Sequence, residues 1–532
     1  MKKLLLILLC LPLIGVGQDF DWAISMGDLN QTSNVHYVES GQGIDVDVNG
    51  DVVITGFFAG SSDFDPGAGV TTLTAVDSLD IFIQKLDVNG NLIWAKSVGG
   101  TGRDASLDLI LDSYGNIYIA GFFNDIVDFD PGVSISNLTA GTSSDIFILK
   151  LDANGNFVWA KSFEGNYINL SIDNSDNLYV TGSFYGVVDF DPGTSVYNLS
   201  SQGYKDIFLL KLDMSGNFVW AKSYGGSYLD DVAMAVNADD NGYVFLTGYY
   251  SGNVDFDPSS LNGNLVSINC SDMFVLKVDA LGNFVWVKSF GGNYNTCGGG
   301  EQGRSILSDD LGNVYVTGFY RDTADFDPGP GIHTLISNGT NPEIFVLKLN
   351  ENGNLVWVYS FGDTTADYGC SIKKDKSGYI YVSGFFGGTI DFDPGAVVKN
   401  LSSTTNTSNF ILKLDTDANF QWARHIEGAS WASQPSLAVD NNYNVFLADE
   451  YYGTIDFDPN SGIYNQTSVD MTDIFVLKLT QTISDLNENL INKEKTLIKI
   501  IDILGRETTP TNNTLLFYIY SDGTVERRVV IE

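Results

Sequence analysis

A string of seventeen residues from Asp145 to Lys161, reading DIFILKLDANGNFVWAK, constrains the fold most because near-copies of it recur along most of the chain. A D-F-D-P string precedes each complete copy, and successive D-F-D-P strings lie 61 to 70 residues apart. A regular internal period is a stronger guide than chain length, so the 532 residues predict one large repeat domain with appendages. The seven D-F-D-P strings begin at Asp63, Asp128, Asp189, Asp255, Asp325, Asp391 and Asp456.

Each repeat unit predicts four strands, which we call a, b, c and d. In the second unit these are Ser106–Asp112, Asn116–Phe123, Asp145–Asp152 and Asn156–Phe163. The a–b and c–d connections both read D-x-x-G-N, which suits a tight hairpin in which Asp caps the turn and Gly takes a positive φ. Each unit is therefore expected to be two hairpins in series.

The predicted strands are apolar on both faces. In strand c of the second unit, Phe147, Leu149 and Leu151 alternate with Ile146 and Ile148. Burial on both faces requires sheets packed between sheets. Four antiparallel strands repeated seven times and packed face to face predict an all-β, seven-bladed β-propeller.

The two ends of the repeat region indicate how the ring closes. Phe20–Gly27 matches strand d without its own strands a, b and c, whereas the last unit ends after a strand c at Asp473–Thr480. We therefore expect the N-terminal strand to complete the seventh blade and protect its edge. A linear β-solenoid, the competing fold, does not predict this split unit.

A longer pattern, G-N-x-x-W-A-K-x-x-G-G, is complete in Gly90–Gly100 and Gly216–Gly226. It resembles the bacterial seven-bladed β-propeller repeat of secreted proteins, and the resemblance covers roughly residues 20–480. The resemblance implies the fold. It supplies no shared catalytic residues that could be transferred to this chain.

The two ends of the chain indicate export. Residues 1–17 carry two lysines, an apolar run and small residues before Gln18, which is the layout of a secretory signal peptide. We expect residues 18–480 to form the propeller, residues 481–496 a linker and residues 497–532 a separate C-terminal domain. No other stretch approaches the roughly 20 apolar residues of a membrane span.

The C-terminal domain resembles the sorting domain of type IX secretion cargo. The resemblance implies that the type IX secretion machinery is a partner and that the protein is secreted or held at the outer cell surface. A small accessory β-domain is the alternative. Matching residues are Lys499, Asp502, Gly505, Arg506 and Glu507 in a first block, and Tyr518, Asp522, Gly523 and Val525 in a second.

Charge and cysteine content limit the partners. The formal net charge is −38, so the surface repels nucleic acid and anionic lipid, and we expect neither as a partner. Beyond residue 17 the chain has three cysteines, Cys270, Cys297 and Cys370, which allow at most one disulfide within the chain. We expect a monomer.

The repeated D-F-D-P string has two interpretations. A rigid turn capped by the first Asp, with Phe packed inward, is favoured over a set of Ca²⁺ sites. A separate loop at Asp45–Asp51 begins like a calcium loop, but its twelfth position is Gly56 instead of Glu. We favour an ordinary hairpin there too, and no cofactor is expected beyond this candidate Ca²⁺. Its ligands would be Asp45, Asp47, Asn49 and Asp51.

Positions that stay the same in every unit are interpreted as architectural. These are the aromatic residue that ends strand b, the Trp of strand d and the Lys of strand c, whose stem we expect to cross apolar surface to water. The d–a loops differ most, so ligand-binding residues are sought there. The candidates are His36, Arg103, Tyr294, Arg304 and Trp431.

Catalysis is not expected. The three histidines, His36, His333 and His425, are scattered through different units, and the chain has no H-E-x-x-H, C-x-x-C or G-x-S-x-G motif. We therefore predict an exported binding or adhesion module for a glycan or a protein. One alternative is a glycoside hydrolase or lyase that uses carboxylates on the loop face. Another is a structural cell-surface protein.

Overall fold

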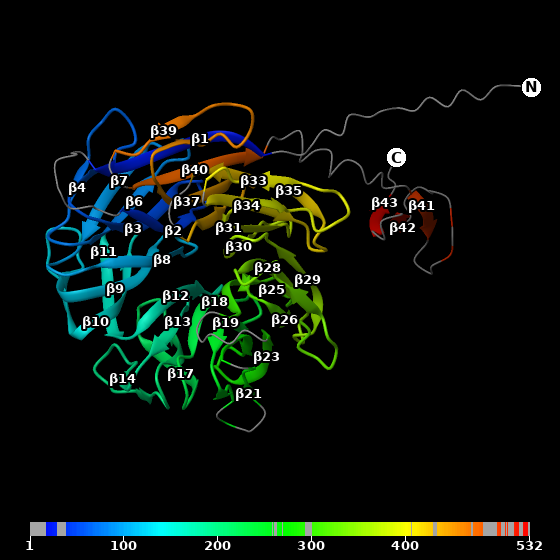
Figure 1. Ribbon diagram of the computed structural model, residues 1–532, viewed down its shortest axis with the longest axis horizontal. Helices are drawn as coiled ribbons and strands as arrows, with labels where there is room; N and C mark the ends of the chain where they lie inside the picture. Colours follow the sequence, from blue (N-terminus) through cyan, green and yellow to red (C-terminus); the bar gives the residue numbers. More distant parts are fainter. Residues whose placement is uncertain are drawn as a thin grey trace, which may run out of the picture. The chain divides into compact units, whose positions relative to one another are not determined.

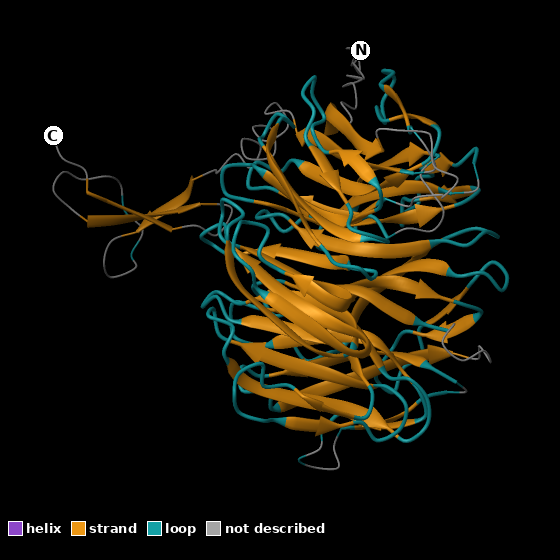
Figure 2. Cartoon of the chain, turned by 90° about the vertical axis from the view of Figure 1, so that its left-hand side faces the viewer, coloured by secondary structure: helices purple, strands orange, loops and turns teal. Residues whose placement is uncertain are grey.

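The computed structural model divides into two compact units, Phe20–Thr480 and the two chain ends, which are described separately. Strands and loops make up the described chain, which contains no helix (Figure 2). A membrane-spanning helix is accordingly absent from the described residues. The description covers residues 18–28, 39–257, 259, 263–268, 270–292, 300–405, 407–428, 434–469, 472–481, 497–501, 506, 508, 515–520 and 525–529.

The larger unit is a ring of seven four-stranded antiparallel sheets, which confirms the predicted propeller (Figure 1). Each inner strand contacts the inner strands of the two neighbouring blades, so the ring is closed. From the inner strand outward, blades 1 to 4 are β2 (Ser40–Val46), β3 (Val52–Phe58), β6 (Asp80–Leu86), β7 (Leu92–Val98); β8 (Ala105–Leu111), β9 (Ile117–Asp128), β10 (Asn137–Leu151), β11 (Phe157–Glu164); β12 (Asn166–Ile172), β13 (Leu178–Phe184), β16 (Asp206–Leu212), β17 (Phe218–Gly226); and β18 (Val232–Ala238), β19 (Val244–Tyr250), β22 (Asp272–Val278), β23 (Phe284–Gly292). Blades 5 to 7 are β24 (Gln302–Ser308), β25 (Val314–Tyr320), β28 (Glu343–Leu349), β29 (Leu355–Phe361); β30 (Tyr368–Lys374), β31 (Ile380–Phe386), β34 (Ser408–Leu414), β35 (Phe420–Glu427); and β36 (Ser436–Val439), β37 (Val445–Tyr451), β40 (Asp473–Gln481), β1 (Gln18–Asp28).

The seventh blade joins the two ends of the repeat region, as predicted. Strand β1 is its outer strand and pairs with β40, which comes more than 400 residues later in the chain. Ala23 and Met26 of β1 are buried, and the Ser25 hydroxyl lies 2.6 Å from that of Tyr451. The N-terminal strand therefore supplies both packing and hydrogen bonds to the last blade.

Seven hydrophobic clusters fill the spaces between adjacent blades, one at each junction. Each cluster draws on both neighbouring sheets, which explains why strands b and c are apolar on both faces. The aromatic residue that ends strand b is fully buried in every blade, and its predicted packing role is confirmed. These residues are Phe58, Phe123, Phe184, Tyr250, Tyr320, Phe386 and Tyr451.

The D-F-D-P strings form short hairpins between strands b and c, and the predicted turn is confirmed. In the first unit, Asp63 Oδ1 accepts the backbone N–H groups of Asp65 and Thr71 at 3.0 and 2.9 Å. Phe64 is fully buried. In blade 2 this hairpin continues β9 and β10. In the other blades it is β4 (Ser61–Asp63) with β5 (Thr72–Thr74), β14 (Val187–Asp189) with β15 (Asn198–Ser200), β20 (Asn253–Asp255) with β21 (Asn264–Val266), β26 (Thr323–Asp325) with β27 (Thr334–Ile336), β32 (Thr389–Asp391) with β33 (Asn400–Ser402), and β38 (Thr454–Asp456) with β39 (Asn465–Thr467).

Repeated Trp or Lys side chains of blades 2, 3, 4, 5 and 7 donate hydrogen bonds to the c–d turn of the next blade. In blade 4, Trp286 Nε1 and Lys277 Nζ both donate to the carbonyl oxygen of Glu351, at 3.1 and 3.4 Å. Glu351 lies in the c–d turn of blade 5, and Gly353 of the same turn has a φ of 73° and faces the Trp286 ring. We call this arrangement the turn latch. It explains why Gly, Trp and Lys recur together in the sequence.

The strand-c lysines do not reach water, and this part of the sequence prediction was wrong. All seven are buried, between 2% and 8% exposed. Their ammonium groups lie at the turns instead. Lys85 Nζ is 2.9 Å from the Asp47 carboxylate, and Lys150 Nζ donates to the carbonyl oxygen of Met214 at 3.0 Å. The a–b turn of the same blade thus provides carboxylates, and the c–d turn of the next blade provides carbonyl oxygens, that compensate the buried charges.

The smaller unit contains a three-stranded antiparallel sheet in the order β41 (Leu497–Ile501), β42 (Leu515–Tyr520), β43 (Val525–Val529). Lys499, Tyr518 and Val525 of the predicted sorting signal lie on these three strands. Asp502, Gly505, Glu507, Asp522 and Gly523 lie outside the described residues.

Candidate functional site

The inner strands leave one edge unpaired, and this edge lines the central channel of the ring. Backbone N–H groups on such an edge need partners. Side chains of the preceding blade supply them: Asp108 Oδ2 accepts the N–H of Leu170 at 2.7 Å, and Asn169 Oδ1 accepts that of Val236 at 2.8 Å. We call these acceptors the inner belt. Its members are Asp45, Asp108, Asn169, Ser171, Asn237 and Ser305.

A β-bulge interrupts the inner strand of blades 1 to 6. Each bulge lies opposite a glycine of strand b, such as Gly56 or Gly318, where an added Cβ would stand about 2 Å from a carbonyl oxygen of strand a. Blade 7 has Asp449 at this position, and the paired part of its inner strand has no bulge. A glycine of strand b thus accompanies the bulge in blades 1 to 6.

The bulged residues turn their side chains toward one end of the channel, where each inner strand begins. A bulge redirects a side chain relative to the strand. Five of the six bulged residues lie five residues before the first Asp of the a–b turn, whereas Tyr167 lies six residues before it because the bulge of blade 3 is one position earlier. Their side chains are chemically diverse. Together with Gln434 of blade 7 they form what we call the channel mouth: Gln42, Leu107, Tyr167, Met234, Arg304 and Cys370.

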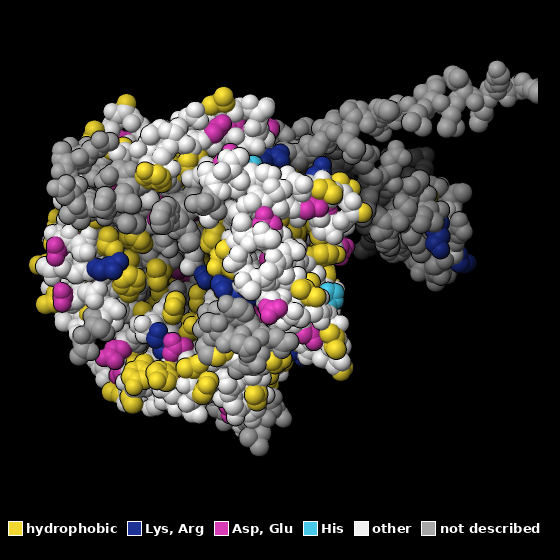
Figure 3. Space-filling model, viewed as in Figure 1, with side chains coloured by type: hydrophobic (Ala, Val, Ile, Leu, Met, Phe, Trp, Pro, Cys, Tyr) yellow, Lys and Arg dark blue, Asp and Glu magenta, His cyan; other side chains and the backbone are white. Residues whose placement is uncertain are grey.

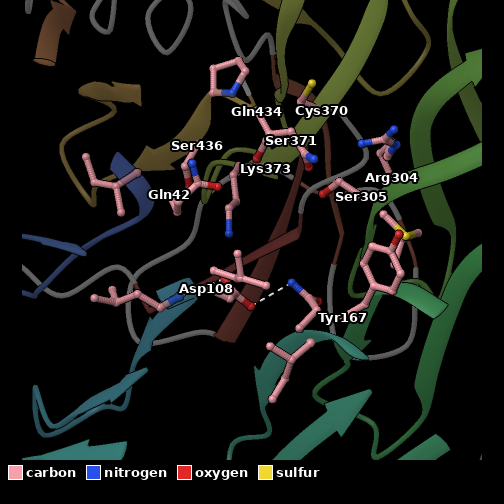
Figure 4. Close-up of a pocket in the computed structure, with 17 residues that line it drawn as sticks. Gln42, Asp108, Tyr167, Arg304, Ser305, Cys370, Ser371, Lys373, Gln434 and Ser436 are labelled. Carbon is pink, nitrogen blue, oxygen red and sulfur yellow. Dashed lines mark hydrogen bonds between the residues drawn. The ribbon is translucent and has the colours of Figure 1, made fainter. Parts of the chain in front are cut away.

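The channel mouth encloses a cavity of about 260 Å³ (Figure 4). Arg304 and Tyr167 lie on one side of it, Gln42 lies opposite, and Lys373 points toward Asp108. A second cavity of about 250 Å³ continues along the channel between Asn237 and Lys374. Basic and hydrophobic side chains are visible together around the central hollow in Figure 3.

Tyr167 has an unusual backbone conformation. Its φ is 54°, in the left-handed region that a bulky L-residue adopts only at a cost of about 1–2 kcal/mol. The residue is nevertheless 47% exposed, so burial of the ring does not offset the conformational cost. At the same distance before the a–b turn, most other blades have Gly, Ala or Ser. The strain therefore serves to place an aromatic ring in the channel mouth.

The carboxylate of Asp108 has hydrogen-bond donors around it, whereas the cations of the cavity lack ion-pair partners among the described residues. Asp108 accepts hydrogen bonds from Leu109 N and Leu170 N, and burial raises its pKa to about 6. Within the described part of the chain, Arg304 and Lys373 have no carboxylate within the 4.0 Å of an ion pair. Arg304 Nε is buried without a hydrogen-bond partner there.

The surroundings of Arg304 are aromatic and neutral. Its guanidinium carbon lies 5.3 Å from the ring centroid of Phe319. Cys370 beside it is a free thiol, and burial raises its pKa to about 12, so the thiol stays neutral near pH 7. Arg304 therefore presents an uncompensated positive charge to the cavity.

The predicted ligand-binding residues do not all converge. Arg304 lies in the channel mouth, whereas Arg103 is exposed and is absent from the cavity lining. His36, Tyr294 and Trp431 lie outside the described residues. Leu107, Tyr167, Met234 and Cys370 were missed because they lie inside strand a, whereas Gln434 precedes the inner strand of blade 7. The signal that could have identified them is the glycine inside strand b, which indicates a bulge in its partner.

The four candidate calcium ligands do not face a common point, because they have different partners. Asp45 belongs to the inner belt and accepts the N–H of Leu111 at 2.9 Å. Asp47 and Asp51 instead face Lys85 Nζ, at 2.9 and 3.5 Å. The backbone N–H of Asn49 donates to Asp47 Oδ1. Across the described residues, no group of three or more His, Cys, Asp or Glu side chains is placed to hold a metal. The calcium assignment stays a prediction.

Comparison with known proteins supports a repeat architecture without naming an activity. No family model matches the chain. The uncharacterized WD repeat-containing protein L264 of Acanthamoeba polyphaga mimivirus is 26% identical over 68% of this chain and 31% of its own length. The regulatory protein FlaEY of Caulobacter vibrioides is 21% identical over 81% of this chain and 46% of its own. The chain thus spans less than half of either relative.

Among solved structures, a protein of unknown function from Bacteroides caccae is 10% identical over 65% of this chain and 89% of its own, with a TM-score of 0.31. A Synechocystis apocarotenoid oxygenase mutant is also 10% identical, over 87% of this chain and 94% of its own, with a TM-score of 0.32. Likeness this low gives no guide to the chemistry of this chain.

Proposed function

We propose that this protein is an exported binding module whose ligand, a glycan or a protein segment, enters the channel mouth. The observation that supports this most directly is the contrast within the repeat. The Gly, Trp, Lys and Asp residues that build the blades recur, while the bulged position presents Gln42, Leu107, Tyr167, Met234, Arg304 and Cys370 to one cavity. A repeat that only built a scaffold would not require a different side chain at each bulge.

The engagement of the carboxylates favours binding over hydrolysis. Asp45 and Asp108 accept backbone N–H groups of neighbouring inner strands, so each has a structural role at the cavity. A glycosidase needs two carboxyl groups free to act as acid and as base or nucleophile. The described cavity offers cations, amides and an aromatic ring instead.

Tyr167→Asn tests this proposal. Asparagine tolerates the left-handed conformation, so the variant should fold at least as stably as the original chain. The full chain is applied to a glycan array and to a panel of immobilised peptides. We expect binding that Tyr167→Asn weakens at least tenfold, with no change in melting temperature beyond a small increase.

Tyr114→Asn provides the matched control, because Tyr114 is an exposed tyrosine in the a–b turn at the opposite end of the sheet. It should leave binding unchanged. Binding that survives Tyr167→Asn would place the ligand elsewhere. Release of shortened sugars from the array would favour the hydrolase.

Export by the type IX machinery remains part of the proposal. It is supported by the signal-like residues 1–17 and by the resemblance of the tail to a sorting domain. In a bacterium with this machinery, the full chain should appear outside the outer membrane. A chain that lacks residues 497–532 should accumulate in the periplasm. Equal export of both chains would contradict a sorting role for the tail.

A further inference from the structure

The positive charges in the cavity stand out against the charge of the whole protein. The chain has 28 Lys and Arg against 66 Asp and Glu. The strand-c lysines form hydrogen bonds in the turn latches or ion pairs with carboxylates of the a–b turns. Arg304 and Lys373, in contrast, line one cavity and form no ion pair with described residues. Arg304 has no carboxylate within ion-pair distance among those residues, whereas the charge of Lys373 acts on Asp45 and Asp108 from beyond that distance. Cations placed beside a cavity in this way favour the binding of an anionic group.

The guanidinium of Arg304 is prepared for such a group. Because Nε is buried without a partner among the described residues, the side chain has an unmet donor at that position. The Phe319 ring, 5.3 Å from the guanidinium carbon, restricts its motion without consuming a donor. A planar fork with free N–H groups matches the two oxygens of a carboxylate.

The rest of the lining indicates the kind of molecule that carries the carboxylate. Amide and hydroxyl groups of Gln42, Ser371 and Gln434 line the cavity, and such groups donate to and accept from sugar hydroxyls. The half-exposed Tyr167 ring lies on the same side as Arg304, where it offers an apolar face to a sugar ring. A cavity of about 260 Å³ is large enough for a terminal sugar.

A peptide is a poorer fit for this site. An extended peptide usually adds to an exposed strand edge through main-chain hydrogen bonds. In this channel, N–H groups of the inner edges are already taken by the inner belt, as Leu170 is by Asp108. Strand addition would have to displace those bonds.

We propose that the channel mouth binds the terminal sugar of an acidic glycan, and that Arg304 binds its carboxylate while Tyr167 packs against the sugar ring. This inference rests on the proposed binding function and narrows its ligand class. Lys373, deeper in the cavity, adds long-range attraction for the same charge (Figure 4).

The test compares sugars that differ only in the charged group. The full chain is measured against uronic acid and sialic acid oligosaccharides, their carboxyl-reduced counterparts, and a tripeptide with a free C-terminal carboxylate. We expect at least one acidic oligosaccharide to bind at least tenfold tighter than its reduced form, with affinity falling as salt is raised.

Variants of Arg304 test whether this residue binds the carboxylate of the sugar. Arg304→Gln should weaken binding of the acidic sugar at least tenfold, and Arg304→Lys should restore part of the loss, because lysine keeps the charge but not the fork. Arg103→Gln removes the same charge outside the cavity and should have no effect. Unchanged melting temperatures would show that each variant is folded.

Three results would overturn the inference. They are equal binding of acidic and reduced sugars, binding of the tripeptide alone, and an Arg304→Gln variant that binds the acidic sugar normally. If neutral sugars bind and Tyr167→Asn abolishes that binding, the channel mouth remains the ligand site and only the carboxylate assignment fails. If no ligand depends on Tyr167, both proposals fail.

Discussion

Buried carboxylates before the inner strands hold adjacent loops and strand ends together through hydrogen bonds. Asp231 is fully buried just before β18, and its two oxygens accept the N–H groups of Gly226 and Ser251 at 2.9 and 2.8 Å. It thereby ties the loop before the inner strand to the end of strand b. Asp104 and Asp367 make the corresponding contacts in blades 2 and 6. These acids position the start of the inner strand, and with it the channel mouth.

Burial makes this position sensitive to pH. Desolvation raises the pKa of Asp231 to about 8, and nearby Asp206 adds to the shift. An unfolded aspartate loses its proton near pH 4, whereas the folded one keeps it up to about pH 8. The folded state therefore binds more protons in this window. The contribution of this proton to the free energy of unfolding is therefore fully present below about pH 4 and is lost as the pH rises toward 8.

We expect Asp231→Asn to reduce this pH dependence. One proton held only by the folded state changes the free energy of unfolding by about 1.4 kcal/mol per pH unit, so the slope between pH 5.5 and 7.5 should fall by about that amount. Urea unfolding at several pH values measures it. Asp230→Asn, at a more exposed carboxylate that makes the smallest contribution to the raised pKa of Asp231, should change the slope far less. Parallel curves for Asp231→Asn and the unmodified chain would contradict the assignment.

At the scale of the strand and turn, the latch explains the most repeated part of the sequence. The carbonyl oxygen of Thr416 accepts from Trp357 Nε1 at 3.2 Å and from Lys348 Nζ at 2.8 Å, as Glu351 does one blade earlier. One carbonyl thus satisfies two buried donors of the preceding blade. The c–d hairpin consequently holds its neighbour and forms its own blade at the same time.

Two tryptophans offer a matched comparison of the latch. Trp286 Nε1 donates to Glu351, whereas Trp159 Nε1 is buried and has no partner among the described residues. Trp286→Phe should lower the free energy of unfolding by about 1 kcal/mol through the lost hydrogen bond, in addition to any packing loss. Trp159→Phe should show only the packing loss.

Chemical denaturation of both variants measures the difference. Equal destabilisation would show that the indole N–H contributes nothing to the latch, and that the tryptophans act only through packing.

At the scale of the whole molecule, ring closure depends on β1. Removing Phe20–Gly27 would expose the edge of β40 and the clusters on both sides of blade 7. Burial of Ala23, Met26 and the surrounding apolar surface should contribute at least about 3 kcal/mol, so we expect a clearly lower melting temperature. Deleting residues 497–532, which lie outside the compact unit Phe20–Thr480, should leave the propeller transition unchanged. An unchanged transition after loss of Phe20–Gly27 would contradict closure by this strand.

A milder change keeps the closure test useful if the deletion does not fold. Ser25→Ala removes the hydroxyl contact with Tyr451 but keeps the strand. It should destabilise the protein by about 1 kcal/mol. Seven-blade cooperativity predicts that the loss appears in one transition and not in a separate, earlier one.

The repeat sequence by itself determined the number of blades, the order of strands within a blade, the capped turns and the split seventh blade. These features depend on local patterns: alternating apolar residues, Asp and Gly at turns, and a fixed period. Such patterns involve residues that are close in sequence, so they can be recognised without the structure. The one architectural error, the placement of the strand-c lysines, arose because their partners lie in turns, of the same blade or of the next one, that are distant in sequence.

The channel mouth was decided only by tertiary structure. Of its residues, sequence reasoning identified Arg304 alone. Gln42, Tyr167 and Cys370 come from three different blades and lie far apart in the chain, and only ring closure brings them to one cavity. These side chains lie at bulges of the inner strands, and at each bulge a glycine of strand b closely approaches a carbonyl oxygen of strand a. Sequence periodicity records which residues alternate, whereas a bulge breaks that alternation through a contact between strands.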